Sequence, residues 1–211
     1  MALGTYAQLQ TAVASWLNRS DLTAVIPDMI TLAETQFKDD FRWRKQLVRD
    51  IIEPPYADEL FETLPTDFLE MKSIHFNTSP VTVPEYVTPT RIRDLQRQFQ
   101  GAVGTPRYFT VVGSQLQFDR IPTGAPELEI LHYVKIPSLS DAATTNDLLT
   151  EYPNIYLYGT LIQAEPYLKN DERMATWAAL YANATDKLKL ADLAAEMNSG
   201  PLIARSSRSI G

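Results

Sequence analysis

Apolar residues recur at helical spacing near the start of the chain. They fall three or four positions apart over residues 5–18, and a second run of the same kind extends over residues 22–40. This spacing places apolar side chains on one face of a helix. The sequence therefore predicts two helices, with Thr5 capping the first. Pro27 either kinks the second helix or lies in its first turn.

The middle of the chain follows a different period. Apolar and polar residues alternate over 42–51, 71–76 and 127–136, a pattern typical of β-strands with one buried face. Gly113–Ser114 separates the β-rich runs RYFTVV and QLQFDR and predicts a hairpin. We expect most of this block to be built from short strands.

A short helix is predicted inside the β-rich block, over residues 89–99. Thr88 provides a capping hydroxyl, and Pro89 suits the first helical position because its missing N–H is not needed there. Gly101 and Pro106 follow and end the helix.

Helical spacing returns in the last third of the chain. One helix opens at Asp147 or Pro153, and the sequence leaves both starts open. A long helix, capped by Asn170 or Asp171, then runs to about Met197. Its expected apolar stripe is Met174, Trp177, Tyr181, Ala184, Leu188 and Ala191.

This order of elements predicts an α+β fold. Helices from the two ends of the chain must pack on each other to bury their apolar stripes, so the terminal helices are expected to form an antiparallel helical bundle. Residues 1–41 and 138–197 are the two parts of this bundle, 42–137 form an inserted β-rich domain, and 198–211 form an extended C-terminal tail.

Composition and charge narrow the function classes. The 211 residues are 45% hydrophobic and 21% charged, which is ordinary for a globular protein, and there is no cysteine. The formal net charge of −7 repels phosphate and argues against nucleic acid as the main ligand. We predict neither a signal peptide nor a membrane-spanning helix, because no segment is long and apolar enough. The chain is therefore expected to be soluble and cytoplasmic when it is made.

A search for catalytic chemistry finds no signature. His75 and His132 lie in separate predicted strands, and each is interpreted as a half-buried histidine with a backbone partner. No glycine-rich phosphate loop or metal-binding motif is present. We therefore predict no catalytic residue, no cofactor, no metal and no enzyme activity.

Two clusters of arginine and lysine leave alternatives open. The segment RWRKQLVR, residues 42–49, either contacts nucleic acid through its basic and aromatic side chains or forms a solvated strand face with Trp43 in the core. Arg91, Arg93 and Arg97 form either an exposed helix face or a subunit contact.

The end of the chain combines apolar and basic residues without any acidic one. Its candidate partner-binding residues are Leu202, Ile203, Arg205, Arg208 and Ile210. Leucine and isoleucine suit a partner surface better than a solvated end, although a frayed terminus is the alternative.

Several ordered segments resemble the head–tail adaptor proteins of tailed bacteriophages. The matching patterns are Tyr6-x-x-Leu9, Ile26-Pro27-x-Met29-Ile30, Leu64-Pro65-x-Asp67-Phe68, Glu165-Pro166-Tyr167-Leu168 and Trp177-x-x-x-Tyr181. The resemblance covers most of the chain and is weakest over residues 78–105.

The resemblance implies a role in the virion, at the head–tail junction. Such adaptors form rings, usually of twelve copies, under the portal protein, and DNA passes through the channel without specific binding. The helical bundle lines the ring, the β-rich insertion faces the tail (nozzle or tube) or fibre proteins, and the C-terminal tail reaches into the portal. Two alternatives stay open, a more distal tail or fibre-attachment protein and a small phage-encoded hydrolase. A deep pocket with shifted titratable groups would favour the hydrolase.

Overall fold

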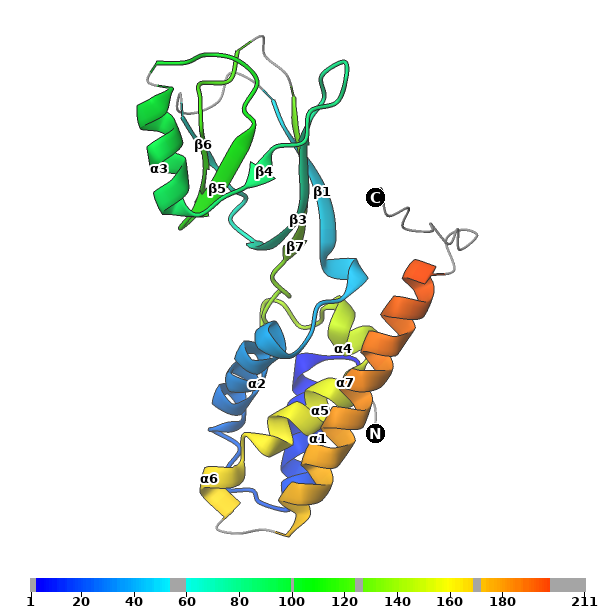
Figure 1. Cartoon of the computed structure of the whole chain (residues 1–211). Coiled ribbons are helices and arrows are strands. Elements are labelled where there is room, and N and C mark those ends of the chain that lie inside the picture. Colours follow the sequence, from blue (N-terminus) through cyan, green and yellow to red (C-terminus); the bar gives the residue numbers. More distant parts are fainter. Residues whose placement is uncertain (1–2, 54–59, 100, 124–126, 169–171, 198–211) are drawn as a thin grey trace, which may run out of the picture. The chain divides into compact units, whose positions relative to one another are not determined.

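The computed structural model describes residues 3–53, 60–99, 101–123, 127–168 and 172–197. Within these ranges the chain forms seven α-helices and two β-sheets, so the predicted α+β class is confirmed (Figure 1). The chain divides into two compact units. We call Met1–Arg44 with Ile136–Gly211 the helical unit, and Lys45–Lys135 the β unit. The domain boundaries at 41/42 and 137/138 stay predictions, and the tail over 198–211 lies outside the described residues.

Local sequence signals mark the starts of several helices of the helical unit, although α2 begins at Ile26 and not at residue 22. They are α1 Tyr6–Leu17, α2 Ile26–Asp40, α4 Asp147–Glu151, α5 Pro153–Ile162, α6 Glu165–Leu168 and α7 Arg173–Met197. The Thr5 hydroxyl caps α1 by accepting a hydrogen bond from an amide of the first turn. Pro27 lies in the first turn of α2. Both predicted starts near residue 150 are used, because α4 begins at Asp147 and α5 at Pro153. The predicted caps of α7, Asn170 and Asp171, lie outside the described residues.

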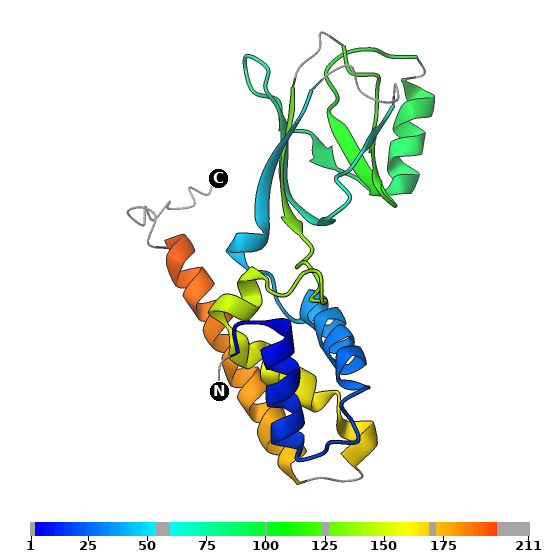
Figure 2. The ribbon, with the colours of Figure 1, turned by 180° about the vertical axis from the view of Figure 1, so that it is seen from behind.

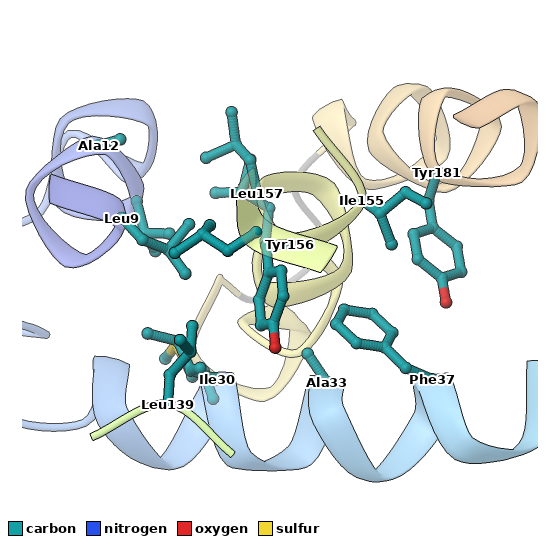
Figure 3. Packing of buried hydrophobic residues seen from close by; sticks show 14 of the residues in the cluster. Leu9, Ala12, Ile30, Ala33, Phe37, Leu139, Ile155, Tyr156, Leu157 and Tyr181 are labelled. Carbon is teal, nitrogen blue, oxygen red and sulfur yellow. The ribbon is translucent and has the colours of Figure 1, made fainter. Parts of the chain in front are cut away.

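One core joins helices from both ends of the chain. Helix α5 lies at its centre and packs against α1, α2 and α7 (Figure 3). Leu9 and Ile30 come from the first two helices, while Tyr156 and Tyr181 come from α5 and α7, and all four are buried. The expectation that the two ends of the chain pack together is therefore confirmed.

Gly159 permits the close approach of three helices. A Cβ atom at this position would lie 2.6 Å from Cε1 of Phe37 and 3.3 Å from Cε2 of Tyr181. Phe37 packs edge-on against Tyr156 and stacks on Tyr181, with ring centroids 5.1 and 6.0 Å apart. The glycine thus makes room for an aromatic cluster that links α2, α5 and α7.

The β unit contains two small sheets. Its strands are β1 Leu47–Ile52, β2 Phe61–Thr63, β3 Phe68–Phe76, β4 Glu85–Tyr86, β5 Tyr108–Val112, β6 Gln115–Phe118 and β7 Leu128–Val134. One sheet has the order β1-β7-β3 and the other β2-β6-β5-β4, and helix α3, Pro89–Gln98, belongs to the same unit (Figure 2). Residues of both sheets, including Phe76, Phe118 and Ile130, share one buried core. The sheets therefore pack through their apolar faces.

Local signals in the β unit are largely confirmed. β5 and β6 form the predicted hairpin, and Gly113 adopts the positive φ of 62° that its turn requires. The predicted short helix is α3, with the Thr88 hydroxyl accepting from the amide of Arg91. The strand predicted from residue 42 is wrong at its start, because Arg44–Gln46 form a 3-10 turn and β1 begins at Leu47.

Candidate functional site

The two histidines lie on opposite faces of one sheet. His75 on β3 faces Glu129 on β7, with 3.8 Å between the imidazole Nε2 and the carboxylate. His132 lies three positions beyond Glu129 on the same strand and therefore on the opposite face of the sheet. The sheet therefore separates the two imidazole rings.

His132 is fully buried, and neither ring nitrogen has a hydrogen-bond partner among the described residues. Its ring stacks on Phe68, and its Nε2 lies 3.7 Å from a carboxylate oxygen of Asp50. The interpretation of His132 as a half-buried histidine with a backbone partner was therefore wrong. Among the residues that the structure describes, no group of three or more histidine and carboxylate side chains could hold a metal ion.

A buried polar network lies in the helical unit. The Tyr156 hydroxyl donates to the Glu34 carboxylate at 3.1 Å, and the same oxygen of Glu34 accepts from the amide of Leu139 at 2.8 Å. Burial raises the pKa of the Tyr156 hydroxyl, and the nearby charge of Glu34 raises it further. These groups hydrogen-bond to one another inside the core, as expected of a network that stabilises the fold.

Asn146 connects this network to the chain that returns from the β unit. Its side-chain amide donates to the carbonyl of Pro137 at 2.7 Å and to the Tyr156 hydroxyl at 2.6 Å. Its side-chain carbonyl accepts from the amide of Leu149 and caps α4. Residues 137–149 are therefore anchored to α2 and α5 through polar contacts inside the core.

Tyr181 of α7 makes a similar contact with α2. Its hydroxyl donates to the carboxylate of Asp40, and burial, followed by that hydrogen bond, raises the pKa of the phenol. The contact fixes α7 against the last turn of α2. Like the Tyr156 network, it stabilises the helical unit.

The β unit contains an apolar groove of about 550 Å³. It is lined by Phe68, Met71, Lys72, Ser73, Ile74, Val83, Pro84, Tyr86, Phe109 and Val111. These residues come from β3, from the segment around β4 and from β5. β3 and β4 are the edge strands of their two sheets, so the groove opens where the sheets are not closed by a further strand.

The groove has the character of a docking surface more than that of a catalytic pocket. Val83 and Tyr86 at its rim are 70% and 58% exposed, which is high for large apolar side chains. The groups with a shifted pKa include Tyr156, Tyr181 and the Arg49–Glu129 pair, and none of them lines the groove. The geometry therefore supports binding of an apolar surface.

Two members of the basic cluster around Trp43 make contacts inside the helical unit. Trp43 is buried and packs edge-on against Tyr152 in the helical unit. The guanidinium of Arg42 donates to the carbonyls of Lys38 and Phe41 at the end of α2. These contacts favour the structural alternative for the cluster, with Trp43 in the core.

Arg49 and Arg97 of these two clusters also have side-chain contacts within the chain. Arg49 binds Glu129 across the β1–β7 pair, and this hydrogen bond lowers the pKa of the carboxyl group. Arg91, Arg93 and Arg97 are exposed on α3, where Arg97 lies 3.7 Å from Asp94. The exposed helix face was one of the two alternatives for this cluster.

The predicted partner-binding residues of the tail lie outside the described residues. They are Leu202, Ile203, Arg205, Arg208 and Ile210. The structure instead reveals surface features that the sequence analysis missed. Leu190 and Leu193 on α7 are 64% and 52% exposed, and Leu32 on α2 is 55% exposed. The three-residue spacing of Leu190 and Leu193 was visible in the sequence, but their exposure was not.

The chain thus combines a core shared by both of its ends, an inserted β-rich unit and exposed apolar side chains. Comparison with protein families shows that the chain belongs to the SU10 adaptor protein family, whose model matches residues 4–205. It is a tailed-phage head–tail adaptor protein, so the resemblance noted from the sequence is confirmed. A search of curated proteins found no match. No helix in the described part is long and apolar enough to span a bilayer.

Proposed function

We propose that this adaptor assembles into a ring at the head–tail junction, binds the portal protein and forms the platform for tail attachment around the DNA channel. The observation that carries the proposal is the family match over nearly the whole chain, residues 4–205. The adaptor occupies the virion, and its role is structural rather than enzymatic.

The helical unit supplies the wall of the proposed ring. Its helices bury one continuous core drawn from both ends of the chain, as expected for the antiparallel bundle of an adaptor. Twelve copies are proposed, following the usual ring of such adaptors. The net charge of −7 supports a channel that lets DNA pass without specific binding.

The C-terminal segment and the β unit are assigned to the portal protein and to the tail or fibre proteins, respectively. The C-terminal segment, with Leu202, Ile203 and Arg205 among its residues, is proposed to reach the portal, because its apolar and basic composition suits a partner surface. The β unit is proposed to meet the nozzle, tube or fibre proteins. Its groove at β3 and β4 supports this assignment, because exposed apolar rims mark contact sites.

A more distal tail or fibre-attachment role is the alternative within the same structural class. It predicts assembly of the chain with tail components and no affinity for portal rings. A phage-encoded hydrolase is the more distant alternative. The apolar lining of the groove gives it little support.

Co-sedimentation tests the proposal. The purified chain is mixed with portal rings of the same phage at near-physiological salt, alongside a variant lacking residues 201–211. The full chain is expected to sediment stoichiometrically with the rings, and the truncated chain to stay in the supernatant. Equal binding by both chains would contradict the role of the tail, and binding by neither would favour the distal alternative.

A further inference from the structure

Helix α7 carries apolar residues on two opposite faces. The inner face consists of Trp177, Tyr181, Ala184 and Leu188, which are spaced four, three and four residues apart and are buried against the rest of the helical unit. This is the stripe that an amphipathic helix needs to join a core. The second face is on the other side of the helix.

The outer stripe of α7 is defined here as Ala179, Ala182, Asp186, Leu190 and Leu193. The spacing is three, four, four and three residues, and all five positions are exposed. At about 100° per residue, this stripe points roughly half a turn away from the inner face. A heptad-like row of this kind is typical of a seam against another helix.

Single exposed leucines are common on protein surfaces, but Leu190 and Leu193 share one face with two alanines. Asp186 is the one polar member of the stripe. Lys187 and Lys189 lie on either side of the stripe, and both are exposed. The outer stripe is therefore a largely apolar strip with a basic border. Its shape and chemistry suit a helix whose apolar surface is bounded by acidic residues.

Helix α2 carries one exposed leucine in a row that begins and ends with an aspartate. Its outer row is Asp28, Leu32, Thr35 and Asp39, spaced four, three and four residues apart and exposed throughout. Leu32 lies in this row between the two aspartates. At about 1.5 Å per residue, the row is about 17 Å long and the outer stripe of α7 about 21 Å, so the two are similar in length.

These two surfaces lie on different sides of the same helical unit. α5 packs against both α2 and α7, and both views show α2 and α7 on either side of it (Figures 1 and 2). The contact between Phe37 and Tyr181 uses the inner faces of the two helices. The outer surfaces of one copy thus point away from each other. A ring requires this arrangement, because each subunit must offer two different surfaces to its two neighbours.

We propose that the outer stripe of α7 in one copy packs on the outer row of α2 in the next copy. Leu190 and Leu193 then lie against Leu32, and the lysines of α7 approach Asp28 and Asp39. This inference rests on the proposed ring function and assigns the surfaces that build the ring. The occupant is a second copy of this chain, since the apolar and charged patterns of the two helices complement each other.

The contact is expected to be weak between two free copies. One helix-on-helix seam of this length buries less than the roughly 1,200 Å² of a small stable interface. Binding of several copies to one portal ring raises their effective concentration and favours the contact. The experiment must therefore compare the free chain with the chain bound to portal rings.

The absence of cysteine from the chain provides a direct test. The variant L32C/L190C carries one thiol on each proposed surface, and the two thiols of one copy face apart. Under mild oxidation we expect a ladder of covalent multimers, with portal rings and also with the free chain at high concentration. The matched control L32C/A191C moves the second thiol by one residue, about 100° around α7, and should give at most dimers.

Two readouts separate this inference from the proposed function. Absence of a ladder under both conditions, while the variant still sediments with portal rings, would overturn the α7–α2 contact and leave the adaptor function standing. A ladder from the free chain without portal sedimentation would support the contact and contradict portal binding. An equal ladder from the A191C control would also overturn the assignment, because the seam would then have no preferred face.

Discussion

A buried polar network in the helical unit and a buried histidine in the β unit differ in their hydrogen bonds. In the helical unit, Glu34, Tyr156 and Asn146 are buried and linked by hydrogen bonds. In the β unit, His132 is equally buried, but its ring nitrogens lack partners within the described part of the chain. Removing a buried group that has hydrogen-bond partners lowers stability, because the partners are left unsatisfied. Removing a buried group without such partners costs little stability. The comparison teaches that Tyr156 and its partners tie the helices of the helical unit together, whereas His132 contributes no hydrogen bond to the β unit.

Apolar packing shows the same contrast. The aromatic cluster around Gly159 leaves no space for a single added carbon, whereas the β unit keeps an open groove of about 550 Å³. In the proposed ring, a helical unit that repeats from copy to copy would benefit from a fixed shape. A surface that meets a different protein benefits from exposed apolar area.

Substitution at Gly159 should give the largest loss of stability. In Gly159→Val the added carbons would overlap the ring of Phe37, which is held between Tyr156 and Tyr181. We expect the free energy of unfolding to fall by about 2–3 kcal/mol, within the range for overpacked cores. Urea unfolding followed by circular dichroism measures this. Gly4→Val is the matched control, because its Cβ meets only a flexible glutamine oxygen at 3.6 Å.

Tyr156→Phe should cost less, about 1–2 kcal/mol at neutral pH, because it removes one partner from each of Glu34 and Asn146. The same urea titration checks this value. An unchanged free energy of unfolding would show that the network is not the source of stability in the helical unit.

The stability of the helical unit should also depend on alkaline pH, through Tyr156 and Tyr181. The pKa of Tyr156 and Tyr181 is raised in the folded chain, so unfolded molecules lose these protons first. Stability is therefore retained below about pH 10 and falls above it by about 1.4 kcal/mol per pH unit for each tyrosine. Urea titrations at several values above and below that pH should show a smaller slope for Tyr156→Phe than for the unaltered chain.

His132→Leu tests whether the buried histidine contributes to the stability of the β unit. Because the imidazole nitrogens have no hydrogen-bond partner among the described residues, an apolar side chain of similar size should leave the free energy of unfolding unchanged or raise it by up to about 1 kcal/mol. The measurement is the same urea unfolding curve. A large loss of stability would mean that the 3.7 Å approach of His132 to Asp50 is a strong ion pair. The buried histidine would then stabilise the β unit as the Tyr156 network stabilises the helical unit.

The smallest effect is expected at the surface of the β unit. Arg49 is mostly exposed where it binds Glu129, and exposed ion pairs contribute little because water and salt screen them. Arg49→Gln should leave the unfolding midpoint unchanged within error, and adding salt should not separate the variant from the unaltered chain. A salt-dependent difference between them would contradict this expectation.

Local chemistry made much of the fold predictable from the sequence. Thr5, Thr88 and Pro27 mark helix starts, and Gly113 marks the hairpin, because each acts through its own backbone or the next turn. Burial of Trp43 was also among the stated alternatives. Such signals need no knowledge of distant partners.

The surfaces were harder to predict because they depend on distant contacts. The groove arises only when β3 and β4 become edge strands of two sheets, an outcome of long-range pairing. The sequence did predict the core-facing stripe of α7, and Trp177, Tyr181, Ala184 and Leu188 are buried as expected, whereas Ala191 is exposed. The outer stripe was missed because one apolar stripe is enough to explain a helix that joins a core.

Electron microscopy of portal rings incubated with the purified chain tests the central claim most directly. The account predicts one additional ring of density on the portal, built from twelve copies, with neighbouring helical units in contact through α7 and α2. Portal rings that stay bare at saturating concentrations of the chain would contradict the adaptor function proposed here.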